Sequence, residues 1–143
     1  MNDWMRRAGG RYHDAFRNAL IKDGWTITHD PFDLEWDDKE LYVNVEEERL
    51  VAAQKQRQKI AVEIIKFLQP LPDNELEHSI DLFAVYRAVL AEQEPDYVLY
   101  LALPEEVYKD VFQDVDSRLI LEKGVKRVIS FDPAREEIIQ WIT

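Results

Sequence analysis

The chain has 143 residues and a net charge of −11, and 46% of its residues are hydrophobic. This length predicts one domain over residues 1–143, with a core that buries about two thirds of the unfolded surface. The absence of cysteine excludes disulfides and thiolate metal sites, and no apolar run approaches the roughly 18–20 residues that span a bilayer. We therefore expect a cytoplasmic protein without membrane contact.

The chain begins with a predicted helix and short strands. Apolar residues recur at helical spacing over residues 11–23. Residues 25–28 are rich in β-forming side chains, and the turn signal Asp30-Pro31 follows them. An irregular acidic stretch precedes another expected strand at residues 41–45.

A hairpin and a helical crossover come next. Residues 50–55 and 60–65 flank the polar tract 56–59, a pattern typical of a hairpin. The second of these strands is apolar at nearly every position, as expected for a central strand that is covered on both faces. A helix over residues 75–92 would lead by a right-handed crossover to a parallel strand at 97–102. The expected buried stripe of this helix comprises Leu76, Ile80, Phe83, Ala84, Leu90 and Ala91.

The last third of the chain predicts a short helix over residues 104–112 and a strand over 125–131. The tail, residues 137–142, is apolar enough to pack against the domain. The order α-β-β-β-β-α-β-α-β predicts an α/β (α+β) fold with a mixed β-sheet flanked by helices.

The charge is distributed unevenly along this order. Residues 71–116 hold twelve acidic residues, whereas residues 51–70 hold four basic residues and one acidic residue. Nucleic acid binding requires a positive surface, and the acidic remainder of the chain opposes tight binding. Weak DNA binding is therefore assigned to basic residues of the N-terminus and the hairpin: Arg6, Arg7, Arg11, Lys55, Arg57 and Lys59.

The strand around Glu63 carries the most informative pattern. PD-(D/E)XK nucleases place an acid on a buried strand and a lysine two positions later; here that position is Ile65, and the lysine comes at Lys66. Because strand side chains alternate between faces, Glu63 and Ile65 share one face, and Lys66 points away unless a bulge re-aims it. In a purely structural role, Glu63 would be satisfied by Lys59, Lys66 or backbone N–H groups.

Metal-dependent phosphodiester cleavage needs at least two carboxylates around Mg²⁺ or Mn²⁺ and a group that activates water. The candidate second carboxylates are Glu46 and Glu48, near the preceding strand. Asn44 and Gln54 are amides, which bind a hard divalent ion poorly. His13, on the first helix, is a further candidate for the same end of the sheet.

Several segments resemble one known family, and together they cover about residues 12–142. In one-letter code they include ALIKDGWTITHDP (19–31), KIAVEI (59–64), LYLA (99–102), FDP (131–133) and EEIIQWI (136–142). The family is XisH, the fdxN-element excision controlling factor proteins of cyanobacteria. The resemblance implies a restriction-endonuclease-like fold and an accessory role in DNA-element excision (site-specific recombination) during heterocyst differentiation. It also implies partners: an XisI-family protein and a site-specific recombinase. A homodimer is a further expectation.

The chain departs from the family pattern at three charged positions. The pattern has aspartate, glutamate and lysine where this chain has Asn44, Gln54 and Ile65. We therefore expect a regulatory protein with a degenerate nuclease site. The alternative is a metal-dependent DNA nuclease that uses Glu63 with Glu46 or Glu48, and Lys66.

Overall fold

A computed structural model describes residues 3–32, 50–64 and 73–142, with side chains described from residue 12 and from residue 80 in the first and last of these segments, and with gaps in the helix after residue 115. The expected strand at 41–45 lies outside the described residues. None of the described helices is long and apolar enough to span a membrane.

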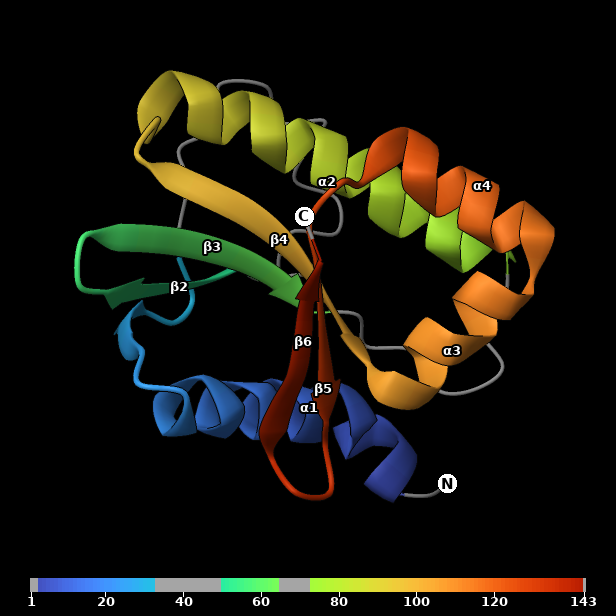
Figure 1. Ribbon diagram of the computed structural model, residues 1–143, viewed down its shortest axis with the longest axis horizontal. Helices are drawn as coiled ribbons and strands as arrows, with labels where there is room; N and C mark the ends of the chain where they lie inside the picture. Colours follow the sequence, from blue (N-terminus) through green and yellow to red (C-terminus); the bar gives the residue numbers. More distant parts are fainter. Residues whose placement is uncertain (1–2, 33–49, 65–72, 143) are drawn as a thin grey trace.

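The described strands form one mixed sheet in which the spatial order equals the chain order (Figure 1). Neighbouring strands are antiparallel in the first two pairs and in the last, and parallel from β3 to β5. This confirms the predicted fold class and the parallel crossover. The strands are β1 (Thr26–His29), β2 (Leu50–Lys55), β3 (Gln58–Ile64), β4 (Tyr97–Pro104), β5 (Val128–Asp132) and β6 (Glu137–Ile142).

The helices divide between the two faces of this sheet. Helix α1 (Asp3–Lys22) lies on one face, and α2 (Asp73–Gln93), α3 (Glu105–Gln113) and α4 (Val115–Gly124) lie on the other (Figure 1). The two connections from β3 to β4 and from β4 to β5 step across the sheet in the same direction. Right-handed crossovers that step in one direction place their helices on one face, which explains the grouping of α2 with α3 and α4.

Strand β3 lies between these two layers. Ile60, Val62 and Ile64 pack in the core under α1, whereas Ala61 packs in the core under α2. This explains why the strand is apolar at nearly every position. Beneath α1, Phe16 and Phe131 meet edge to face with ring centroids 5.1 Å apart.

Two features of the C-terminal part differ from expectation. The segment after α3 forms the additional helix α4, and β5 therefore begins at Val128 rather than at residue 125. The tail is a strand, β6, paired antiparallel with β5. Asp132 Oδ1 accepts hydrogen bonds from the backbone N–H groups of Ala134 and Arg135, which closes the turn between these strands.

Helix α2 contains a correction to the predicted buried stripe. Ile80, Phe83 and Leu90 are buried as expected, but Ala84 and Ala91 are exposed. Tyr86 is buried in their place. The larger ring removes more apolar surface from water than an alanine methyl group, so the helix turns its aromatic side toward the sheet.

Candidate functional site

Glu63 occupies a buried position near the end of the central strand. Its side chain is 2% exposed. It shares the α2 face of β3 with Ala61, and its ladder neighbours are Leu50 on β2 and Leu101 on β4. A buried carboxylate with apolar neighbours is costly to keep charged. Glu63 is therefore the described residue around which we look for a candidate site.

Gln54 lies on the same face of the neighbouring strand but not beside Glu63. It pairs with Lys59, whereas Glu63 pairs with Leu50. Four ladder positions therefore separate Gln54 from Glu63, which corresponds to about 13 Å along the strand. Gln54 therefore belongs to the hairpin end of the sheet and lies apart from the buried acid. The side-chain amide Nε2 of Gln54 donates a hydrogen bond to the backbone carbonyl of Gln56 in the hairpin turn.

The other predicted members of the nuclease-type site cannot be placed against Glu63. Asn44, Glu46, Glu48, Ile65 and Lys66 lie outside the described residues. Within the described part of the chain, no group of three or more His, Cys, Asp or Glu side chains is arranged to hold a metal ion. The described residues by themselves therefore do not fit a Mg²⁺ or Mn²⁺ centre.

His13 lies on the other face of the sheet from Glu63. It belongs to α1, and its Nε2 lies 2.6 Å from Asp30 Oδ1. The Asp30 side chain is 11% exposed and also forms an ion pair with Arg17, whose Nη1 lies 3.6 Å from Asp30 Oδ2. These contacts tie α1 to the end of β1. His13 therefore lies toward the same end of the sheet as Glu63 but on the opposite face, so the two side chains do not share one site.

A polar contact that sequence reasoning missed lies on the α2 face, at the carboxyl end of β4. Ser130 is fully buried on β5, and its Oγ donates a hydrogen bond to Glu105 Oε2 at the start of α3. The sequence signal was a serine within an otherwise apolar strand, which requires a buried partner. This contact holds the first turn of α3 against the sheet.

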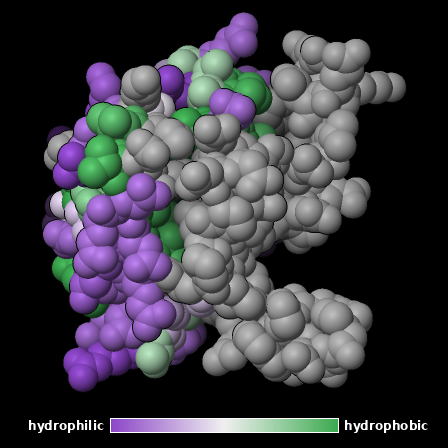
Figure 2. Space-filling model, turned by 90° about the vertical axis from the view of Figure 1, so that its right-hand side faces the viewer, coloured by the Kyte–Doolittle hydropathy of each residue, from purple (hydrophilic) through white to green (hydrophobic). Residues whose placement is uncertain are grey.

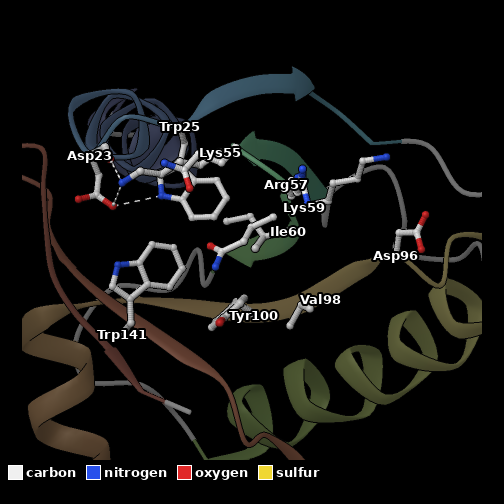
Figure 3. A pocket seen from close by; sticks show the side chains of 12 residues that line it. Asp23, Trp25, Lys55, Arg57, Lys59, Ile60, Asp96, Val98, Tyr100 and Trp141 are labelled. Carbon is white, nitrogen blue, oxygen red and sulfur yellow. Dashed lines mark hydrogen bonds and ion pairs between the residues drawn. The ribbon is translucent and has the colours of Figure 1, made fainter.

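The hairpin cations line a cleft of about 590 Å³ at the other end of β3 (Figure 3). Lys55, Arg57 and Lys59 contribute to its lining. Aromatic rings also line this cleft: Trp25 and Trp141 have ring centroids 5.5 Å apart, and Lys55 Nζ lies 6.0 Å from the Trp25 ring centroid. The side chains of the remaining predicted nucleic-acid contacts, Arg6, Arg7 and Arg11, lie outside the described part of α1.

The fold and these positions define an α/β protein with a central mixed sheet and a buried acidic residue on its middle strand. The family model described as "XisH protein" matches residues 7–139. The chain belongs to the XisH family.

Two solved structures resemble the chain over nearly its whole length. One is a fdxN element excision controlling factor protein from Anabaena variabilis, 39% identical, which aligns over 94% of this chain and 99% of its own with a TM-score of 0.77. The other is an XisH family protein from Nostoc punctiforme PCC 73102, 34% identical, over 93% of this chain and 99% of its own with a TM-score of 0.78. No curated protein matches the chain significantly.

Proposed function

We propose that the protein is a non-catalytic accessory factor that controls the excision of a DNA element through protein partners. The observation that carries this proposal is the XisH family match over residues 7–139, together with the excision-controlling function in the name of the Anabaena relative. The proposed partners are an XisI-family protein and a site-specific recombinase, and the proposed setting is cyanobacterial heterocyst differentiation.

The surroundings of Glu63 support a non-catalytic role. Its ladder neighbours Leu50 and Leu101 offer no metal ligand, and Gln54 is both neutral and displaced along the strand. Hydrolysis of a phosphodiester with a bound divalent ion depends on several converging oxygen ligands. The restriction-endonuclease-like fold that the family resemblance implies stays a prediction, because the two solved relatives are described by their family and not by that fold.

A partner surface is supported by exposed apolar residues on α4. Val115 and Leu119 are both largely exposed and lie one helical turn apart on the same side of the helix. Figure 2 shows the right-hand side of the view in Figure 1, where hydrophobic and hydrophilic side chains of the described residues lie next to one another. An apolar group within a polar rim is typical of a protein interface.

Co-expression with an XisI-family protein from the same genome tests this proposal. The mass of the purified species would be measured by light scattering after gel filtration. A stable hetero-complex is expected. A chain that ignores the partner and elutes as a homodimer or larger homo-oligomer would overturn the partner-dependent function.

The alternative function is a metal-dependent DNA nuclease. One observation favours it: an acid that is 2% exposed occupies the position on the central strand that the PD-(D/E)XK pattern gives to its metal-binding carboxylate. If this alternative holds, Glu63 would hold Mg²⁺ or Mn²⁺ with Glu46 or Glu48, and Lys66 would orient water. We expect no Mn²⁺-dependent cleavage of plasmid DNA by the natural chain.

Restoring the family's charged residues sharpens this test. The variant Asn44→Asp, Ile65→Lys, with Gln54 left unchanged because it lies about 13 Å along the strand from Glu63, should gain cleavage if the site is a degenerate nuclease centre. The same variant with Glu63→Gln is the control and should stay inactive. Cleavage by the natural chain that is lost in Glu63→Gln would replace the accessory function by the nuclease function.

A further inference from the structure

Two hollows lie next to each other where β4 begins. The first, which we call the aromatic cleft, has a volume of about 590 Å³ and includes Trp25, Tyr100 and Trp141. The second, which we call the basic groove, has a volume of about 270 Å³ and lies between α2, β4 and the segment before β5. Val98, which is 37% exposed, lines both.

The aromatic cleft offers ring surfaces to a ligand. Trp141 lies between Trp25 and Tyr100, with centroid distances of 5.5 Å and 5.2 Å. Trp25 is buried, whereas Tyr100 and Trp141 are only partly buried and border the cleft. In Figure 3 the two tryptophans lie on one side of the cleft, and Arg57 and Lys59 lie on the other. Such rings provide stacking surfaces for nucleobases.

The charge of this surface is opposite to that of the whole chain. Its carboxylates are Asp23 and Asp96, against six cations in the two linings: Lys55, Arg57, Lys59, Arg87, Lys126 and Arg127. Asp23 and Lys55 are engaged with each other: Lys55 Nζ lies 4.0 Å from Asp23 Oδ2 and donates a hydrogen bond to the Asp23 carbonyl, while Oδ2 also accepts one from Trp25 Nε1. Five of the six cations then remain against Asp96. Among the residues that the structure describes, no acid lines the basic groove. In a protein with a net charge of −11, this concentration of cations favours an anionic ligand.

The two hollows lie on opposite faces of the sheet and meet at the start of β4, where Val98 lines both. Lys59 lines the aromatic cleft, and its Nζ lies 5.7 Å from the ring centroid of Tyr97, which lines the basic groove. A single nucleotide would fill one hollow, whereas a chain of nucleotides can occupy both. The arrangement of stacking rings followed by cations matches the requirements of a single strand, whose bases and phosphates are both accessible.

We propose that this surface binds single-stranded nucleic acid, with bases stacked in the aromatic cleft and phosphates held by the cations of both hollows. The site lies at the hairpin end of β3, away from Glu63 at the other end of that strand. The proposal goes beyond the accessory function, because it requires neither a protein partner nor an intact nuclease site. In this proposal Arg87, Lys126 and Arg127, and not the N-terminal arginines, bind the nucleic acid together with the hairpin cations.

Fluorescence polarisation of a labelled 12-nucleotide thymidine strand, titrated with the purified chain alone, tests the proposal. We expect binding at 50 mM NaCl that weakens steeply at 200 mM, as counterion release requires. Arg57→Glu and Arg127→Glu should each weaken binding about tenfold. Arg135→Glu, with the same charge change in the β5–β6 turn at the far end of β5, is the matched control and should alter affinity by less than about twofold. Absence of binding at low salt, or equal losses in all three variants, would overturn the proposal.

A second pair of variants tests the stacking. Tyr100→Leu keeps an apolar side chain but removes the ring, and should weaken binding about tenfold. Tyr108→Leu removes a ring that packs against Phe112 on α3, and should leave affinity unchanged. Thermal unfolding of each variant verifies that the fold is retained. Unlabelled polyglutamate and deoxythymidine monophosphate serve as competitors. If either one displaces the labelled strand as effectively as unlabelled strand does, the site binds acidic peptides or mononucleotides, and the assignment to a single strand is overturned.

Discussion

Gln54 and Glu63 lie on the same face of adjacent antiparallel strands but are held four ladder positions apart, because Gln54 pairs with Lys59 and Glu63 pairs with Leu50. The register is fixed by the turn at Gln56 and Arg57, which joins β2 directly to β3. A residue at position 54 therefore belongs to the hairpin end of the sheet and not to the surroundings of the buried acid.

This separation predicts that Gln54→Glu does not create a metal site at Glu63. A carboxylate about 13 Å away along the strand cannot share a divalent ion whose ligands lie at 2.0–2.6 Å. We expect MnCl2 to change the melting temperature of Gln54→Glu and of the natural chain equally. A larger Mn²⁺-dependent rise in the variant, abolished by Glu63→Gln, would contradict the register argument.

The contact between His13 and Asp30 is expected to stabilise the attachment of α1 to β1. Asp30 is mostly buried, so removing either partner should lower the free energy of unfolding by about 1–2 kcal/mol. A double-mutant cycle with His13→Ala and Asp30→Ala, measured by urea denaturation, should give a coupling of about 1 kcal/mol. The parallel cycle with Asp14→Ala is the control, because Asp14 also contacts His13 but is exposed. Equal coupling free energies in the two cycles would show that the His13–Asp30 contact stabilises the fold no more than the exposed His13–Asp14 contact does.

Gly124 at the end of α4 is predicted to be required for packing against α2. A Cβ at this position would overlap the Cγ2 methyl group of Ile80. Gly124→Ala should therefore destabilise the protein by about 1–3 kcal/mol. Ile80→Leu, which removes the β-branched methyl group but keeps the side-chain volume, should recover part of this loss in the double variant, as judged by thermal unfolding.

Gly24 supplies the comparison for that experiment. Its φ is +95°, a backbone conformation that an L side chain adopts only with strain. Gly24→Ala should also be destabilising, but Ile80→Leu should not relieve it, because the cause is the backbone and not the contact with α2. Rescue of both glycine variants by Ile80→Leu would indicate a general effect of residue 80 on stability.

The exposed apolar residues of α4 are expected to contribute to partner binding. Leu119 is 47% exposed, and Leu119→Glu should abolish co-elution with an XisI-family protein without lowering the melting temperature of the isolated chain. Ile139 on β6 is 48% exposed and provides a matched substitution on a different element. If Ile139→Glu disrupts the complex and Leu119→Glu does not, the partner surface lies on β6.

The sequence by itself determined the central strand, the first helix and the parallel crossover. An apolar run broken only by Glu63 can be satisfied only where both faces of a strand are covered, and the apolar spacing of Ala15, Phe16 and Leu20 can be buried only on one side of a helix. These patterns are local and belong to the individual elements. They also carried the family resemblance, which the match over residues 7–139 confirms.

The tertiary structure decided which residues come together. The register of β2 against β3 could not be predicted from the sequence. The turn between them has Gln56 in a left-handed conformation, with a φ of 56°, where a glycine would have been the usual signal. The sequence also does not predict that His13 meets Asp30, or that Trp25, Tyr100 and Trp141 gather at one cleft from three separate strands or their approaches. Each of these contacts joins residues far apart in the chain, and its position depends on strand register and on the order of strands in the sheet. Local side-chain patterns carry no information about either, so the aromatic cleft and the isolation of Gln54 from Glu63 became visible only in the folded chain.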